Sequence, residues 1–202
     1  MSPTRHWLYA AVVFTAAFFS LVLVARALWI PAKAELAQWL IEYSWEQSLA
    51  GDEQARPWPW ADTRPMGVLS LPGRNIRQIV LEGNSGRNLA FGPVLLDGSV
   101  PGQDLVISGH RDTHFRFLKD LSPGDPIRIQ LRDRTDIYEV SQLEVVDSRW
   151  NELVIEPGTR RLSLVTCYPF DTPFAGGPLR YVVTALPAAS NLRHSPRSPS
   201  SG

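Results

Sequence analysis

The sequence has a single cysteine, Cys167, among its 202 residues. One thiol cannot form an intrachain disulfide, and it cannot supply the several thiolates of a structural zinc or iron–sulfur site. Lysine and arginine balance aspartate and glutamate, 20 against 20, and no basic tract with interleaved aromatic residues occurs. The chain therefore lacks the electrostatic features of a nucleic-acid-binding protein, and no nucleic acid is expected as a partner.

Charged residues are also absent from a stretch of 19 residues, Trp7–Ala25. Together with the apolar residues that follow Arg26, this stretch is long enough to cross a hydrocarbon core of about 30 Å. The alternative is a cleavable signal peptide, because Ala25–Ala27 has the small-x-small form of a cleavage site. The apolar run is longer than the usual core of a signal peptide. We therefore expect residues 1–30 to be a short cytoplasmic tail and a transmembrane signal anchor.

The orientation of this anchor follows from what lies on each side of it. The positive-inside rule hardly favours either orientation, since Arg5 lies on one side of the span and Arg26 and Lys33 lie on the other. Because only a short tail precedes the span, we expect a single pass through the inner (cytoplasmic) membrane with the N-terminus inside. The lipid bilayer is then a partner of residues 7–30, and the remaining chain lies in the periplasm or otherwise outside the cytoplasm. An unpaired thiol there calls for a functional reason.

Residues 31–65 are expected to contain an amphipathic helix and then a linker rich in proline and tryptophan. Apolar residues recur in 32–50 at the period of a helix, which either lies on the membrane surface or packs against the domain that follows. The linker reads as an extended strap, and we expect its Trp58 and Trp60 to pack onto that domain. The apolar positions of the helix are Leu36, Trp39, Leu40 and Tyr43.

From residue 66 onward the pattern changes to short runs rich in valine, isoleucine and leucine, separated by glycine, proline, asparagine and aspartate. Many short strands without a long helix are typical of a closed or nearly closed β-barrel, so 66–187 is predicted to be an all-β domain. The segment 188–202 is rich in serine and proline and is predicted to be disordered. The predicted strands are Met66–Leu71, Arg77–Glu82, Asp104–Gly109, Ile127–Leu131, Ile137–Val146, Arg161–Cys167 and Arg180–Leu186.

Three residues in this domain could carry out chemistry together. Cys167 and His110 each stand at the end of a predicted strand, where a substrate can reach them. A cysteine attacks carbonyl groups as its thiolate, and so needs a partner that stabilises the anion or removes the proton. Arg180 begins the last strand and could donate hydrogen bonds to a thiolate or an oxyanion. Taken separately, Cys167 could be a buried small side chain, His110 could cap a loop and Arg180 could form a surface ion pair. Together the three residues favour an acyl-transfer site.

His110 and His114 also raise the question of a metal, because two histidines four residues apart can chelate zinc on a helix. Here the pair begins at a strand end, and the segment lacks the glutamate of the HExxH motif. No metal site and no other cofactor is therefore expected.

Three motifs in the order SGHRDTHF, LSLVTCYPF and GGPLRYVV resemble those of the sortases, which are membrane-anchored cysteine transpeptidases. The cysteine motif of that family is commonly TLxTC, and this chain departs only at the first position, where Ser163 stands for threonine. The forms HRDTHF and TCYPF look most like class D sortases. The strap RPWPWADTRP and the GPLR segment look more like the sortase type of Gram-negative bacteria. The resemblance covers roughly Arg56–Pro187.

The resemblance implies a closed eight-stranded sortase β-barrel for residues 66–187, preceded by the transmembrane and amphipathic helices. By position it implies Cys167 as the nucleophile, His110 as the general acid/base and Arg180 as the residue that stabilises substrate and oxyanion. Thr166, beside the nucleophile, is a candidate substrate-binding residue.

The similar enzymes cleave an LPxTG-like sorting signal near the C-terminus of an exported protein. They form a thioacyl-enzyme and pass the acyl group to an amine. The expected partners are therefore an exported protein with such a signal and an amine acceptor. Two alternatives remain open: a cysteine peptidase on the same barrel that releases its substrate by hydrolysis, and a non-catalytic envelope module that only binds peptides.

Overall fold

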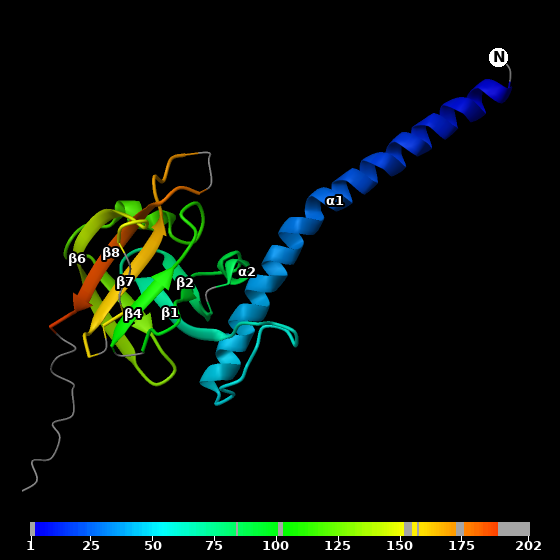
Figure 1. Ribbon diagram of the computed structural model, residues 1–202. Helices are drawn as coiled ribbons and strands as arrows, with labels where there is room; N and C mark the ends of the chain where they lie inside the picture. Colours follow the sequence, from blue (N-terminus) through cyan, green and yellow to red (C-terminus); the bar gives the residue numbers. More distant parts are fainter. Residues whose placement is uncertain are drawn as a thin grey trace, which may run out of the picture. The chain divides into compact units, whose positions relative to one another are not determined.

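The computed structural model describes residues 3–83, 85–100, 103–151, 155–156, 158–172 and 176–189. The chain forms two compact units, Met1–Leu40 and Ile41–Gly202. The first unit is the greater part of helix α1 (Pro3–Leu49), and the second contains the end of that helix and all eight strands (Figure 1). The predicted disordered tail, 188–202, lies outside the described residues beyond Ala189.

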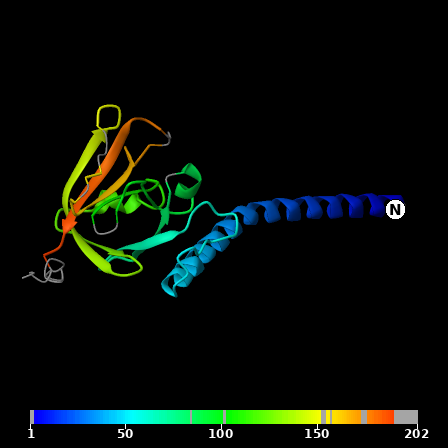
Figure 2. The same ribbon diagram turned by 60° about the horizontal axis from the view of Figure 1, so that its bottom comes forward.

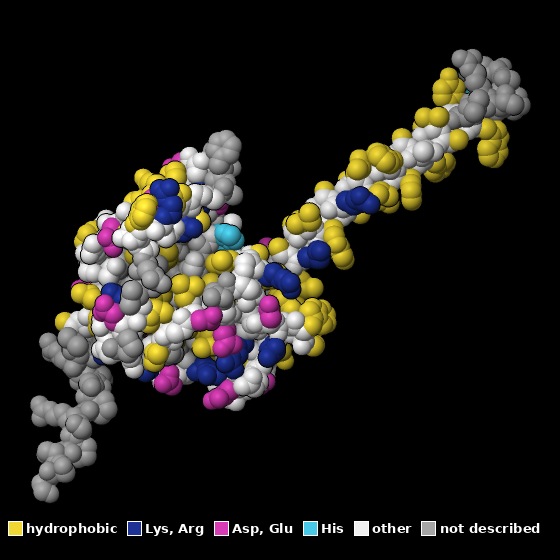
Figure 3. All heavy atoms as spheres, in the orientation of Figure 1, with side chains coloured by type: hydrophobic (Ala, Val, Ile, Leu, Met, Phe, Trp, Pro, Cys, Tyr) yellow, Lys and Arg dark blue, Asp and Glu magenta, His cyan; other side chains and the backbone are white. Residues whose placement is uncertain are grey.

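Helix α1 runs without interruption from Pro3 to Leu49, with Pro31 inside it. The predicted anchor and the predicted amphipathic helix are therefore one continuous helix. Apolar side chains cover its surface (Figure 3), and every residue from 11 to 30 is exposed. Such a surface is favourable in hydrocarbon and unfavourable in water. The helix is long and apolar enough to cross a membrane by length and composition, as predicted.

Eight strands close into a barrel in the order β1-β2-β3-β4-β7-β8-β6-β5. Figure 2 shows the strands from a second direction. The pairs β2–β3 and β4–β7 are parallel and the others antiparallel. Closure pairs the edges that an open sheet would expose, and the prediction of a closed all-β barrel is confirmed. The strands are β1 (Pro65–Leu71), β2 (Ile76–Glu82), β3 (Val94–Leu95), β4 (Asp104–Ser108), β5 (Pro126–Gln130), β6 (Thr135–Asp147), β7 (Arg161–Cys167) and β8 (Leu179–Pro187).

Seven of these strands agree with the sequence-based prediction to within two residues at each end. The exception is β3, which has only two residues and therefore no alternating run to recognise. Two short helices, α2 (Gly86–Leu89) and η1 (Arg116–Asp120), were also not predicted. The second of them lies in the connection between β4 and β5, directly after the HRDTH motif.

Ile41 and Trp45, in the last turns of α1, are both buried. Ile41 contacts apolar residues of β2 and β3, and Glu42 accepts two hydrogen bonds of 2.7 Å from Arg77 on β2. Tyr43, a member of the predicted apolar stripe, is exposed. In this part of the helix the barrel therefore covers a different face from the one the periodicity indicated.

The two tryptophans of the strap differ in their surroundings. Trp58 packs beside the cluster that contains Ile41, and its ring meets Phe91 edge-on with centroids 5.2 Å apart. Trp60 is 83% exposed, so the prediction that it packs onto the domain is wrong. The chain turns here, with the N–H of Ala61 donating to the carbonyl of Trp58 at 2.9 Å, and Trp60 lies within that turn.

A buried ion pair fixes the first residues of β4 and β7 against each other. Asp104 begins β4 and is fully buried, and Arg161 begins β7. The Arg161 guanidinium donates to both carboxylate oxygens, at 2.6 and 3.1 Å, and the N–H of Glu156 donates to one of them at 3.0 Å. Such a bidentate pair sets a definite register, here that of the parallel strands whose other ends carry the candidate site.

Tyr138 on β6 is fully buried, and its hydroxyl has no hydrogen-bond partner among the described residues. Burial, reinforced by the nearby Asp136 carboxylate, raises the pKa of Tyr138 to about 12. Its neutral form is therefore favoured in the folded protein. The stability that this contributes is full below pH 10, the pKa of an unfolded tyrosine, and is lost as the pH rises through about 12.

Replacing Tyr138 with phenylalanine is expected to raise the free energy of unfolding at pH 7 by about 1 kcal/mol, because an unpaired buried hydroxyl is removed. Above pH 10 the advantage of the variant should grow by a further 2 to 3 kcal/mol, roughly, since phenylalanine does not titrate. Urea unfolding of both proteins in detergent, from pH 7 to pH 12, measures this. A variant less stable than wild type at every pH would contradict the absence of a partner for the hydroxyl.

Candidate active site

The parallel pairing of β4 with β7 places His110 and Cys167 at the same rim of the barrel. Ser108, the last residue of β4, pairs with Val165 on β7. Gly109 continues the ladder, because its N–H donates to the carbonyl of Val165 at 3.1 Å. His110 lies two residues beyond Ser108, and Cys167 lies two residues beyond Val165. His110 is exposed and Cys167 is partly exposed, so both can meet a substrate.

Arg180 on β8 directly faces Cys167, its register partner in the antiparallel pair β7–β8. Residues opposed in this way project from the same face of a sheet. The face is the outer one, because side chains alternate along a strand and Leu164 is part of the barrel core. Val165 and Val182, on the same face as Cys167 and Arg180, belong instead to a separate apolar cluster.

Two backbone carbonyls hold the Arg180 guanidinium. Its Nη1 donates to Gly177 at 2.7 Å and to Leu179 at 2.9 Å. Within the described part of the chain no carboxylate forms an ion pair with it. Its role as a surface ion-pair residue, one alternative from the sequence, is therefore not observed there. The head group is fixed by neutral carbonyls, on a residue whose strand position faces that of Cys167.

Thr166 lies on the opposite face from Cys167 and is buried. Its hydroxyl donates to the carbonyl of Gly109 at 2.7 Å, which ties the cysteine strand to the chain just before His110. Contact with substrate stays a prediction for Thr166. What the geometry shows is a hydrogen bond that holds the two ends of the site together.

Gly109 and Phe115 set the path of the backbone at His110. Phe115 is buried in the core, and its N–H donates to the carbonyl of His110 at 2.9 Å. A Cβ atom on Gly109 would lie only 2.7 Å from Cγ of Phe115, which is well inside van der Waals contact. The glycine therefore allows the ring to pack directly beneath the histidine loop. Neither residue was predicted, although a glycine immediately before the histidine is a visible signal.

Replacing Gly109 with alanine is expected to lower the free energy of unfolding by about 1 to 3 kcal/mol, as for overpacking in a core. Because the strain is released by moving the His110 backbone, kcat/KM should fall by at least about 10-fold. Gly86→Ala is the matched control, since a Cβ there meets nothing within 4 Å. Urea unfolding and peptide cleavage measure both effects. Equal behaviour of the two variants would mean that Phe115 moves aside without disturbing the site.

His114, the second histidine of the HRDTH motif, has a more enclosed setting than His110. Its Nδ1 lies 3.1 Å from Oε1 of Gln78 on β2. Burial lowers the pKa of His114 below its usual value, a hydrogen bond to the backbone of Ala90 opposes this, and the charge of His110 lowers it further. The two histidines are thus close enough to interact, and the more buried one is held neutral.

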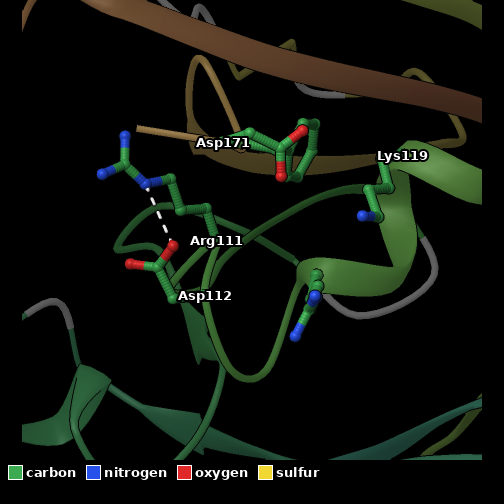
Figure 4. Close-up of a pocket in the computed structure, with 6 residues that line it drawn as sticks. Arg111, Asp112, Lys119 and Asp171 are labelled. Atoms are coloured by element: carbon green, nitrogen blue, oxygen red, sulfur yellow. Dashed lines mark hydrogen bonds and ion pairs between the residues drawn. The ribbon is translucent and has the colours of Figure 1, made fainter. Parts of the chain in front are cut away.

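A polar pocket of about 210 Å³ lies between the loop that follows His110 and the loop that follows Cys167 (Figure 4). Figure 4 shows Arg111 and Asp112 joined on one side, with Asp171 and Lys119 on other sides of the space. Charges of both signs therefore surround a space adjacent to the candidate catalytic rim. The lining residues are Arg111, Asp112, Arg116, Lys119, Phe170 and Asp171.

The sortase domain model of protein families matches residues 69–188. The chain belongs to the sortase family. Sortase D of Bacillus subtilis is 31% identical over 121 residues, which cover 58% of this chain and 61% of that protein. This sortase chain thus spans about three-fifths of the length of its curated relative. The likeness to a class D enzyme agrees with the HRDTHF and TCYPF motifs, while the likeness to the Gram-negative type stays a prediction.

Solved structures give the same fold. The sortase D5 transpeptidase of Clostridium perfringens superposes with a TM-score of 0.54 over 62% of this chain and 79% of that one, at 21% identity. Pilus-related sortase C of Group B Streptococcus superposes with a TM-score of 0.53 over 61% of this chain and 67% of that one, at 29% identity. At 21% identity, the likeness to the Clostridium perfringens enzyme shows a shared fold only. The eight-stranded sortase barrel predicted from the motifs is confirmed.

Proposed function

We propose that this sortase is a membrane-anchored transpeptidase that cleaves an LPxTG-like sorting signal near the C-terminus of an exported protein. The acyl group would pass through a thioester on Cys167 to an amine acceptor. The observation that carries the proposal is the convergence of His110, Cys167 and Arg180, from three different strands, on one rim of the barrel. Binding alone requires no thiol at this rim.

Each of the three residues has a task that fits its position. The Cys167 thiolate attacks the scissile carbonyl, and the negative charge that develops on the carbonyl oxygen faces the fixed guanidinium of Arg180. The C–N bond then breaks, and the His110 imidazolium gives a proton to the leaving amine. In the second half the acceptor amine attacks the thioester, neutral His110 takes its proton, and the thiolate leaves. The cycle returns every group to its starting state.

A buried apolar cluster on the outer face supports the strands that carry the site. Val106, Val165 and Val182 lie on the same face as Cys167 and Arg180 and are at most 5% exposed, with Val146 and Ile155 packed against them. This packing holds β4, β7 and β8 in place at the candidate catalytic rim.

The compartment follows from the family and from helix α1. Sortases act outside the cytoplasm, and α1 could span a membrane. We therefore infer that residues 7–30 anchor the chain in the inner membrane and that the barrel works on its outer, periplasmic side. There the unpaired thiol has its functional reason, and no second cysteine in the chain can oxidise with it.

The test uses the full chain in detergent with a panel of LPxTG-like peptides, followed by intact-protein mass spectrometry with and without a primary amine. A mass increment equal to the N-terminal peptide fragment, removed by the amine to give an amide product, is the expected result. Cleavage to the free acid that the amine does not alter would make the protein a hydrolytic cysteine peptidase. Binding of peptide with neither adduct nor cleavage would make it a binding module.

A further inference from the structure

Arg111, the residue after His110, is a buried charge for which the proposed reaction has no use. Its side chain is only 6% exposed, and placing a guanidinium in such a setting is unfavourable unless its donors are satisfied. Within the described part of the chain, its ion pair is with Asp112, whose carboxylate lies 3.3 Å from Nε and whose side chain is 67% exposed. A surface ion pair of this kind contributes little, so the reason for burying the arginine lies elsewhere.

Two hydrogen bonds of Arg111 reach across the site to the loop that follows Cys167. Nη1 donates to the carbonyl of Pro169 at 2.9 Å, and Nη2 donates to that of Thr172 at 3.1 Å. Both acceptors lie about sixty residues away in the sequence. One planar group therefore joins the histidine loop to the cysteine loop, on the side where Figure 4 shows Arg111 at the edge of the polar pocket.

The two-carbonyl contact requires the shape of arginine. A guanidinium presents several N–H groups in one rigid plane, whereas an ammonium is a single compact donor group on a flexible stem. A lysine at this position could reach one of the carbonyls without holding the other. The contact thus fixes the orientation of the cysteine loop as well as its distance from the histidine loop.

We propose that Arg111 is a positioning residue, which fastens the loop after Cys167 to the loop of His110 and so holds the imidazole against the thiol. This inference rests on the proposed function for its effect on turnover. Its effect on the thiol does not depend on any substrate. Arg111 acts through the backbone, by holding the carbonyls of Pro169 and Thr172 in the loop that follows the thiol.

Arg161 provides a matched control. It joins β4 to β7 through the buried Asp104, at the end of the two strands that is opposite to the site. Removing either arginine breaks a buried contact and should lower stability. Only Arg111 lies next to the catalytic rim, so only its loss should change the reactivity of Cys167.

The test is alkylation of Cys167 by iodoacetamide across pH, with the full chain in detergent. A thiol next to an imidazolium gives up its proton more readily, so the pH profile reports how close His110 is held. Arg111→Met should shift this profile most of the way to the profile of His110→Ala. In a protein that already carries His110→Ala, adding Arg111→Met should cause no further shift. Arg111→Lys, which keeps the charge if the methionine variant fails to fold, should shift it part of the way. Arg161→Met should leave it unchanged.

In peptide turnover, Arg111→Met should lower kcat by about 10- to 100-fold, as for a misplaced catalytic group, with KM changed by less than about 3-fold. A profile unchanged in both Arg111 variants, or shifted equally with and without His110, would overturn the proposal. A wild-type protein that turns over no peptide would defeat the proposed function instead, and the alkylation profiles would still decide the role of Arg111.

Discussion

Replacing Cys167 with alanine is expected to abolish both cleavage and transfer of a sorting peptide, with kcat/KM falling by at least about 10⁴-fold. The thiol is the only one in the chain, so no second cysteine can take over. The side chain is partly exposed at the end of β7, and its loss should change the free energy of unfolding by less than about 1 kcal/mol. Chromatography of the peptide products and urea unfolding measure the two quantities.

The same variant separates catalysis from binding. Cys167→Ala should bind the peptide with a Kd within about 3-fold of the wild-type value, because truncation of one small side chain removes little apolar surface. Its mass spectrum should show no adduct. Residual turnover above one part in a hundred would mean that another group is the nucleophile.

The barrel could be predicted because each strand has a recognisable pattern in its own short stretch of sequence. Alternating and continuous apolar runs bounded by turn residues located seven strands, and only the two-residue β3 was missed. The order of the strands is a different matter. The parallel pairing of β4 with β7 joins segments more than fifty residues apart. The sequence of neither segment indicates that the other is its partner. The motifs implied this pairing only through the resemblance to a family.

The candidate site divides in the same way. Residues at strand ends that could carry out chemistry, Cys167, His110 and Arg180, were visible as residue types in plausible positions. Their supports, Gly109 and Arg111, act through contacts with Phe115 and with the backbone of a distant loop. Such contacts depend on which loops meet at the rim of the folded barrel. They could therefore not be predicted from the sequence.

Replacing His110 with alanine is the second large effect expected, with kcat/KM falling by about 10²- to 10⁴-fold, the range that general acid/base catalysis contributes. His114→Ala is the matched control four residues away. Because His114 is turned to Gln78 and held neutral by burial, its loss should lower kcat/KM by less than about 10-fold, as for a residue outside the proton transfers.

The pH dependence of stability distinguishes the same two residues. A lowered pKa means that the folded protein favours neutral His114, so the stability this contributes is present above pH 6.5, the pKa of an ordinary histidine, and is lost as the pH falls through the lowered value. His114→Ala should remove that acid loss, whereas His110→Ala should retain most of it. Urea unfolding between pH 4 and pH 8 checks this. Equal losses of activity in the two variants, with equal acid profiles, would show that the histidines act as one unit, and the assignment of His110 alone as the acid/base would be wrong.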